Sequence, residues 1–286
     1  MKVLVAGASG SLGKAVCAQL LARGCSVRAL VRNANTAPNG TQPFVADALV
    51  KGALAHIGDD VTHVFSCLGA PVSPSKKGRA GFDAVDVPAN LALLEAVAGK
   101  SVARIVYVSA HHDADLRRLT YFDAHERVAE AVRKTGVSSA IIRPTGFFGA
   151  FAEFIPMAQK GSLPIFGDGS ARTNPIAEED LATVCVDALL GQGGDVDVGG
   201  PDTLSRADIA TLAFEALGLP VRLRFAPLWA AQVATTLIHP FHPRLAQSMA
   251  FIAAVSTRDA VAPAYGQRRL VDAFRALAAQ AGKHAS

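Results

Sequence analysis

The 286-residue sequence has only four cysteines, and no two of them have the C-x-x-C spacing of a zinc site or redox pair. Cys17, Cys25, Cys67 and Cys185 lie far apart, and three of them fall inside segments with the pattern of helices or strands. This placement predicts buried thiols in a reducing compartment, with neither disulfides nor a metal site.

Long apolar runs and clustered charge are also missing. No stretch reaches the roughly 18–20 uninterrupted apolar residues of a membrane helix, and the first residues lack the basic and apolar segments of a secretory signal. The net charge of +4 comes from scattered Lys and Arg residues, so nucleic-acid binding is not indicated. We therefore expect a cytoplasmic protein with no transmembrane segment.

Hydrophobic residues, in contrast, make up 50% of the chain, and their order at the start is informative. An apolar run at 2–6 is followed by Gly7, Gly10 and Gly13, then by a helical pattern and a second apolar run at 25–31. Glycines at such a turn let the backbone approach a pyrophosphate, and the helix N-terminus attracts its negative charge. An ordinary strand-to-helix turn is the alternative. The position of these glycines between a strand and a helix favours a dinucleotide site.

Arg32 stands at the end of the second apolar run. An NAD-selective site usually carries an acidic residue there, which accepts hydrogen bonds from the ribose 2′-hydroxyl. A basic residue can instead pair with a 2′-phosphate. Arg32 therefore predicts NADP(H) as the cofactor, with Arg28 and Lys14 as lesser contributors, and a solvated loop arginine is the alternative.

The GASG sequence after the first strand and the spacing of the glycines resemble the extended and atypical short-chain dehydrogenase/reductases, in particular their NmrA-like NAD(P)-binding branch. The resemblance spans residues 2–275. It implies an α/β fold with a doubly wound parallel Rossmann sheet and a small C-terminal lobe over the carboxyl ends of the strands. We expect residues 1–150 to form the dinucleotide-binding core. Residues 151–286 would supply late core elements and the substrate lobe, within one structural unit.

The resemblance also implies which residues contact the cofactor. Asp47 would hydrogen-bond the adenine amino group, or would cap a helix predicted over 48–57. The turn after the fourth strand would lie beside the adenosine, and the segment IIRPTGFFG would flank the nicotinamide. The expected cofactor contacts are Gly7, Ser9, Gly10, Ser11, Leu12, Gly13, Arg32, Asp47, Leu68, Gly69, Pro144, Thr145, Gly146 and Phe147.

A third group of residues predicts the catalytic centre. The apolar run at 102–109 is typical of a central parallel strand, and it ends at Ser109, where the resembled family has a serine that polarises the substrate carbonyl. Tyr121 would be the proton donor of the family's Tyr-x-x-x-Lys pair, but His125 occupies the lysine position. Histidine is shorter and mostly neutral near pH 7. We take Ser109, Tyr121 and His125 as catalytic candidates; alternatively, Tyr121 packs on its helix and His125 is exposed.

His111 and His112 lie between these candidates, and Asp113 and Asp115 follow them. Two histidines and two carboxylates can form a metal site, but apart from His125 no matching ligand cluster follows at helical spacing. We therefore expect His111 and His112 to line the substrate pocket, together with Phe148.

These residues predict an NADP(H)-dependent oxidoreductase of a small carbonyl or enone-like substrate. The changed lysine position favours the alternative, a non-catalytic NADP(H)-binding redox sensor or regulator that acts through a protein partner. The apolar helices expected at 229–238 and 245–255 would cover a substrate pocket or form a homodimer face. Binding to a membrane surface is disfavoured because only Arg244 lies between them.

Overall fold

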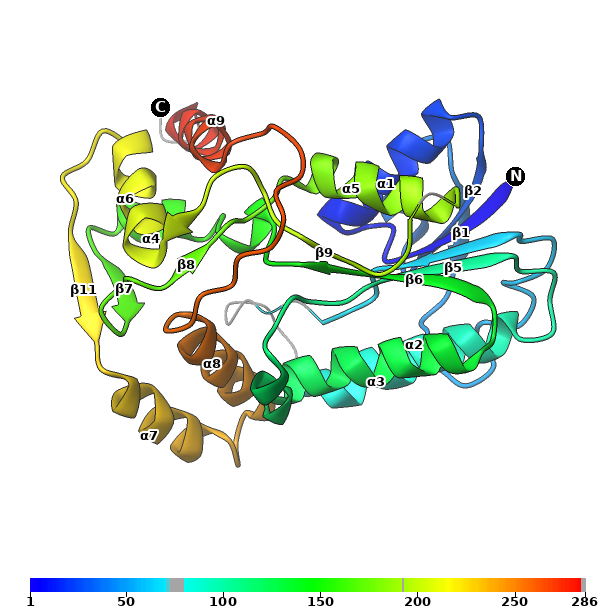
Figure 1. Ribbon diagram of the computed structural model, residues 1–286, viewed down its shortest axis with the longest axis horizontal. Helices are drawn as coiled ribbons and strands as arrows, with labels where there is room; N and C mark the ends of the chain where they lie inside the picture. Colours follow the sequence, from blue (N-terminus) through cyan, green and yellow to red (C-terminus); the bar gives the residue numbers. More distant parts are fainter. Residues whose placement is uncertain (71, 73–79, 192, 284–286) are drawn as a thin grey trace.

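The computed structural model describes residues 1–70, 72, 80–191 and 193–283, and a parallel sheet of seven strands forms its centre (Figure 1). The strand order is β3-β2-β1-β4-β5-β6-β9. This order reverses between β1 and β4, so the carboxyl ends of these strands meet at a topological switch point. The fold is the Rossmann-like α/β fold that the sequence predicts. The strands are β1 (Lys2–Ala6), β2 (Ser26–Val31), β3 (Gln42–Val45), β4 (His63–Ser66), β5 (Arg104–Val108), β6 (Ser138–Pro144) and β9 (Val196–Val198).

Successive side chains of each strand point to opposite faces of the sheet. Val3 and Val5 of β1 belong to the core under α1 and α5, whereas Leu4 and Ala6 belong to the core under α2 and α3. Figure 1 shows these helix pairs on opposite sides of the sheet. Because both faces are covered, the central strands are mostly apolar, which explains their apolar runs in the sequence. The helices are α1 (Ser11–Ala22), α2 (Phe82–Val97), α3 (Thr120–Lys134) and α5 (Glu178–Leu189).

The helix α5 comes from the second half of the chain and packs beside α1. The Gln19 side chain donates to the carbonyl oxygen of Glu179 at 2.8 Å and to the Thr183 hydroxyl at 3.1 Å. Arg23 pairs with Asp187 at 2.7 Å. The strand β9, which follows α5, adds to the sheet beside β6. The second half of the chain thus completes the core that the first half begins.

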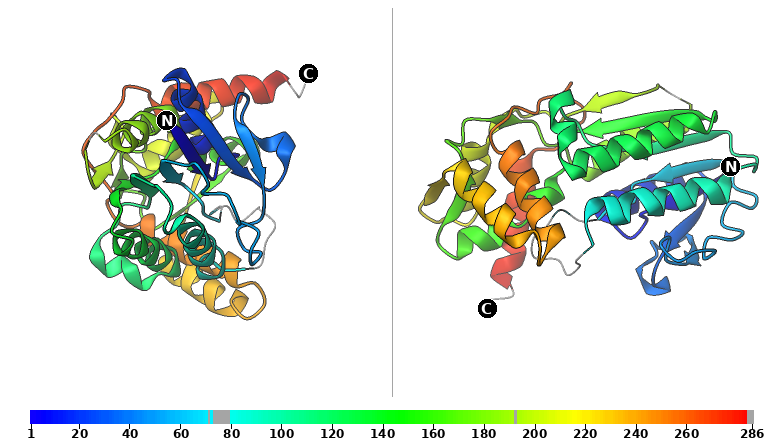
Figure 2. Two further views of the ribbon diagram at one scale, coloured as in Figure 1. Left: turned by 90° about the vertical axis from the view of Figure 1, so that its right-hand side faces the viewer. Right: turned by 90° about the horizontal axis from the view of Figure 1, so that it is seen from below.

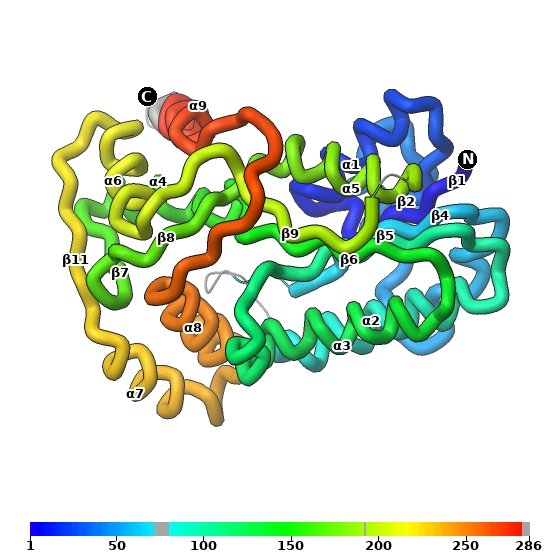
Figure 3. Tube along the Cα trace, in the orientation of Figure 1, coloured from blue at the N-terminus to red at the C-terminus, as the bar shows by residue number. Residues whose placement is uncertain are grey.

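A second lobe lies beyond the carboxyl ends of the strands (Figures 1 and 3). Its own core contains Ile155, Ile165, Phe214 and Phe274. The chain then continues through α7 and α8, which lie between this lobe and the end of α3 when seen from below (Figure 2, right). The elements of this part are η3 (Phe148–Ala150), α4 (Phe154–Gln159), β7 (Leu163–Phe166), β8 (Arg172–Thr173), β10 (Leu204–Ser205), α6 (Arg206–Ala216), β11 (Leu223–Ala226), α7 (Leu228–Ile238), α8 (Pro243–Val255) and α9 (Leu270–Lys283).

Residues 48–60 depart from the sequence prediction. The pattern predicts a helix over 48–57, but the structure has a succession of turns there. His56 and Asp60 have positive φ angles of 66° and 59°, a conformation that residues other than glycine rarely adopt and that ends any helix. The helix prediction for this segment is wrong.

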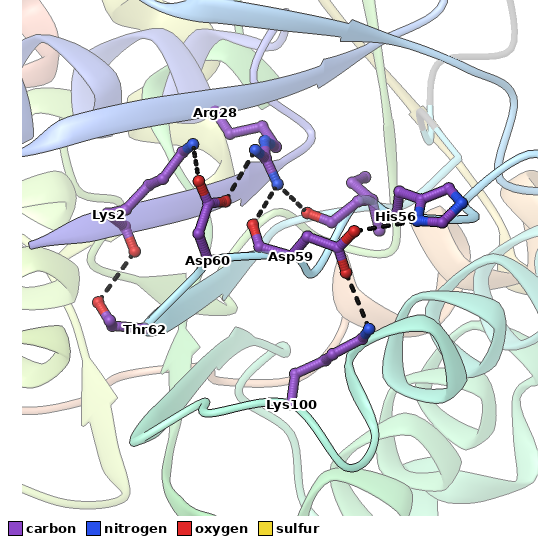
Figure 4. A network of polar contacts seen from close by, with 8 residues as sticks. Lys2, Arg28, His56, Asp59, Asp60, Thr62 and Lys100 are labelled. Atoms are coloured by element: carbon purple, nitrogen blue, oxygen red, sulfur yellow. Dashed lines mark hydrogen bonds and ion pairs between the residues drawn. The ribbon is translucent and has the colours of Figure 1, made fainter.

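Figure 4 shows the polar contacts that hold these turns against the strands. The Arg28 guanidinium donates to the carbonyl oxygens of Ile57 at 2.7 Å and Asp59 at 2.8 Å, and it pairs with the Asp60 carboxylate at 3.0 Å. Lys2 pairs with the same carboxylate at 2.8 Å and lowers the pKa of Asp60 by this hydrogen bond. The Arg28 guanidinium therefore binds the turn before β4 and is not available to bind a 2′-phosphate.

Candidate functional site

The glycine turn joins β1 to α1 at the switch point. Gly7 has a φ of +87°, and a Cβ there would lie 2.8 Å from the carbonyl oxygen and Sγ of Cys67. A Cβ on Gly13 would lie 2.2 Å from the carbonyl oxygen of Gly7. The packing of the protein itself therefore requires both glycines. A Cβ on Gly10 would come no closer than 3.4 Å to a protein atom. The space beside the Gly10 backbone is therefore free for a ligand.

The helix α1 begins at Ser11, with Gly10 as its N-cap and no side chain that caps it. The first N–H groups of a helix have no acceptor within the helix, and the helix dipole adds positive charge at this end. Ser9 and Ser11 are exposed beside the turn, whereas Leu12 is buried and can contribute only its backbone. This end of α1 therefore has the geometry of an anion site.

Two polar residues follow the strands next to this turn. Arg32 is exposed directly after β2, and within the described part of the chain it has neither a hydrogen-bond nor an ion-pair partner. Asp47 follows β3, and its carboxylate accepts a hydrogen bond from the backbone N–H of Leu49 at 2.9 Å. Asp47 thus caps a turn rather than the predicted helix. Arg32 stays available to a ligand at the same edge of the sheet.

The loop after β4 is held by two buried residues of α2 that are not among the predicted site residues. Asn90 accepts from the Ser66 hydroxyl at 2.7 Å and donates to the carbonyl oxygen of Leu68 at 3.1 Å. Asp86 accepts from the backbone N–H of Ala70 at 2.6 Å. The two side chains share one face of α2 because they are four residues apart, and this spacing was the available signal. They fix the loop of Leu68 and Gly69 beside the glycine turn.

Asp86 is the most perturbed carboxyl group near this loop. It is 1% exposed, and burial raises its pKa to about 7, although the Ala70 N–H and the nearby Arg244 act in the opposite direction. Its Oδ2 atom has no hydrogen-bond partner among the described residues. A carboxyl group in this state gains or loses its proton near neutral pH.

Ser109 follows β5, and its backbone N–H donates to the carbonyl oxygen of Ile142 at 2.8 Å. Its hydroxyl is buried, and no described residue hydrogen-bonds it. Buried hydroxyl groups nearly always have a partner, so a carbonyl oxygen of a ligand would satisfy this one. Tyr121 lies in the first turn of α3 with its ring centroid 5.2 Å from that of Phe82 and 4.3 Å from that of Phe251. Burial raises the pKa of Tyr121.

His125 lies four residues after Tyr121, with its ring 4.7 Å from the tyrosine ring. It is 7% exposed, so the alternative of a solvent-exposed His125 is wrong. Its Nδ1 atom is 2.8 Å from the hydroxyl oxygen of Tyr107 on β5. Burial lowers its pKa to about 4, which leaves the imidazole neutral at pH 7. His125 therefore lacks the positive charge that a lysine would bring to this position.

The other expected pocket residues have partners inside the protein. The Nδ1 atom of His111 is 3.3 Å from the Asp197 carboxylate, and the His112 ring stacks on Phe122 with 4.6 Å between centroids. Phe148 packs into the core of the second lobe. Among the residues that the structure describes, no group of three or more His, Cys, Asp or Glu side chains could hold a metal ion.

The turn after β6 is attached to the second half of the chain. The backbone N–H of Thr145 donates to Val198, and its hydroxyl donates to the carbonyl oxygen of Asn174 at 2.7 Å. The carbonyl oxygen of Gly146 accepts from Ile176 at 2.9 Å, and Phe147 forms a bridge with the same residue. This turn, which begins at the end of β6, is therefore fixed by residues 174–176.

Glu178 is a further site residue that sequence reasoning missed. This buried carboxylate accepts from the backbone N–H of Gly149 at 3.0 Å and takes a hydrogen bond from the Ser11 hydroxyl. Burial raises its pKa. Glu178 thus links the start of α1 to η3, and the run of three acidic residues at the start of α5 was the only sequence signal.

The switch point in the strand order, the close-packed glycine turn and the uncapped start of α1 define a dinucleotide-binding domain of the Rossmann type. Residues 7–192 match the NAD(P)H-binding family. The chain belongs to this family, in agreement with the NAD(P)-binding resemblance that the sequence shows.

Curated relatives and solved structures are consistent with this assignment. The chloroplastic divinyl chlorophyllide a 8-vinyl-reductases of Oryza sativa subsp. indica and Zea mays are each 29% identical, over 79% of this chain and 63% and 64% of their own. The Photosystem II assembly factor Ycf39 of Guillardia theta is 26% identical, over 68% of this chain and 62% of its own. This chain therefore spans less than two thirds of the length of these relatives.

The UDP-glucuronic acid 4-epimerase from Bacillus cereus, in complex with UDP-glucuronic acid and NAD, is similar in structure. Its TM-score is 0.72 at 17% identity, with 99% of this chain and 100% of that chain covered. A nucleoside-diphosphate-sugar epimerase from Staphylococcus aureus has a TM-score of 0.69 at 16% identity and 96% coverage of both chains. At this identity the similarity establishes the fold.

Proposed function

We propose that the protein is an NADP(H)-dependent oxidoreductase that reduces a small carbonyl or enone-like substrate. The observation that carries the choice of cofactor is the unpaired, exposed Arg32 at the carboxyl end of β2, beside the glycine turn. The relatives named as 8-vinyl-reductases support a reduction as the reaction. The buried thiols Cys17, Cys25 and Cys185 suit a reducing compartment such as the cytoplasm.

The residues of the site fit a dinucleotide. The N–H groups at the start of α1 would bind the pyrophosphate, and Arg32 would pair with the 2′-phosphate. Gly69 and the turn 145–147 would lie along the rest of the molecule. When bound, the cofactor supplies a hydride. The Ser109 hydroxyl would then donate its unused hydrogen bond to the substrate oxygen, and the Tyr121 hydroxyl would hold the proton that completes the reduction.

Arg32→Ala is expected to weaken NADPH binding by about 10- to 100-fold, because a charge-assisted hydrogen bond contributes about 1.5–3 kcal/mol. NADH, which lacks the 2′-phosphate, should bind equally to the variant and the wild type. The measurement is thermal unfolding at increasing concentrations of each nucleotide. Arg127→Ala removes an exposed arginine of α3 and is the matched control. Equal binding of NADH and NADPH to the wild type would contradict NADP specificity, and binding of neither would contradict the cofactor itself.

Tyr121→Phe is expected to lower kcat by about 100-fold or more with an enone or ketone substrate, since general acid catalysis contributes roughly 10²–10⁴-fold. NADPH affinity should not change. Steady-state kinetics and nucleotide titration of the variant give both quantities, with Tyr265→Phe as a control in a tyrosine outside the site. An unchanged kcat would show that the proton comes from elsewhere.

The second candidate is a non-catalytic sensor of the NADPH/NADP ratio that acts through a protein partner. The observation that favours it is the neutral, buried His125, which pairs with Tyr107 instead of providing a charge near Tyr121. The relative named as an assembly factor also supports a role through a partner. Tight NADPH binding by the wild type without turnover of any carbonyl or enone substrate would favour this candidate.

A further inference from the structure

The helix α7 leaves a row of large apolar side chains exposed. We define the α7 face as Phe225, Trp229, Val233, Leu237 and Phe241, which recur every four residues from β11 through α7 to the chain after it. Their exposed fractions lie between 51% and 79%. Along α7 itself, the only buried residue is Ala231. The helix lies at the outer edge of the molecule and packs against α8 (Figures 1 and 2).

The segment of chain that carries the α7 face has arginines and no acidic residue, and Asp168, next to Gly169 in the turn beside Phe225, is a carboxylate that another segment brings near it. The sequence contains no Asp or Glu from residue 216 to residue 258. Arg222 and Arg224, both exposed, stand on either side of Leu223 in the chain, immediately before the first member of the face. The other two arginines of the stretch are occupied elsewhere, because Arg244 is buried and Arg258 pairs with Asp115 at 2.7 Å.

From this face we infer that the protein binds the surface of a lipid bilayer that contains anionic lipids, with α7 lying in the plane of the interface. This differs from the expectation from the sequence, which counted only Arg244 between the two helices and did not consider Arg222 and Arg224 before α7. The exposed apolar side chains and the tryptophan of α7 are those of an interfacial helix, and the basic residues that such a helix carries on its polar face are here supplied by Arg222 and Arg224 before it. The exposed arginines would meet the lipid phosphates. Across residues 1–70, 72, 80–191 and 193–283, no helix has the length and apolar character needed to cross a membrane.

A second copy of the chain fits this face less well. In a two-fold symmetric dimer the same patch meets itself, so Arg222 and Arg224 of each copy would face the 216–258 segment of the other. The stretch from 216 to 258 offers no carboxylate to pair with them. An anionic bilayer supplies the missing negative charge and covers the apolar side chains at the same time.

Trp229 is the only tryptophan of the sequence and lies in the α7 face, so it reports binding directly. With vesicles of equal parts phosphatidylcholine and phosphatidylglycerol, the full chain should co-sediment, and its tryptophan emission should shift to shorter wavelength. Binding should weaken with phosphatidylcholine alone and with added salt. The Phe241→Ser/Leu237→Ser variant should bind at least about 10-fold more weakly, because two large apolar side chains no longer leave water on binding.

The Val45→Ser/Val50→Ser variant removes two exposed apolar residues far from α7 in sequence and should bind vesicles like the wild type. Thermal unfolding of both variants checks that the substitutions leave the fold intact. Absence of co-sedimentation and of an emission shift would overturn the proposal. A dimeric mass by light scattering, with an emission shift that depends on protein concentration and not on lipid, would also overturn it in favour of a second copy.

Discussion

Gly13→Ala is expected to lower the free energy of unfolding by about 3 kcal/mol and to abolish stabilisation by NADPH. The new Cβ would lie 2.2 Å from the carbonyl oxygen of Gly7 and 2.8 Å from the Cα of Ala8. Both are backbone atoms, so the turn must open instead of a side chain moving aside. Overpacking of this kind typically costs about 1–3 kcal/mol, and it displaces the N–H groups that would bind the pyrophosphate.

Urea unfolding with and without NADPH measures both effects. For the wild type, a nucleotide at about 100 times its Kd adds roughly 2.7 kcal/mol. Gly194→Ala is the matched control, because a Cβ at Gly194 meets no atom within 4 Å. A Gly13→Ala protein with wild-type stability and full stabilisation by NADPH would contradict the close approach of α1 to the glycine turn.

Asp86→Asn is expected to remove a large pH dependence of stability. The pKa of Asp86 is about 7 in the folded protein and near 3.8 in the unfolded chain. As pH rises, the unfolded chain therefore loses its proton first, and the folded state is progressively disfavoured up to its own pKa. The wild type should lose about 4 kcal/mol from this group between pH 4 and pH 8. Asparagine stays neutral and can still accept from Ala70.

The measurement is urea unfolding of both proteins across this pH range, and the difference between their free energies of unfolding isolates Asp86 from the other titrating groups. The groups that act on its charge are Arg244, which favours the ionised form, and Asp83, which opposes it. A difference that does not change with pH would mean that Asp86 stays ionised throughout.

The fold could be predicted because the signals that specify it are local. Strands covered on both faces appear as short unbroken apolar runs, and helices on the sheet show helical spacing, as at Phe82–Val97. The prediction of a helix over 48–57 was wrong because the contacts that shape this segment are distant in the sequence. Its turns are held by Arg28, which is about thirty residues away in the chain, and local pattern carries no information about such a contact.

The candidate site was predictable to the extent that its residues belong to contiguous motifs. The glycine turn and Arg32 could be recognised from their order along the chain, whereas Glu178 acts on Ser11 from the other half of the sequence. The burial of His125 could have been predicted from the helical spacing of its apolar neighbours. His125, Val128, Ala129 and Val132 share one face of α3 and are all buried, so the spacing of their apolar neighbours placed the histidine toward the sheet.

The packing of α5 on α1 bears on how the chain reaches its native state during synthesis. The side chains of Gln19 and Arg23 bond to residues between 179 and 187. At roughly 5–20 residues per second, a ribosome needs about ten to thirty seconds to make the intervening chain. Until then, the apolar residues of α1 that pack against α5 would lack this cover. We propose that residues 1–150 and 151–286 therefore acquire their structure together, as one folding unit, rather than in succession.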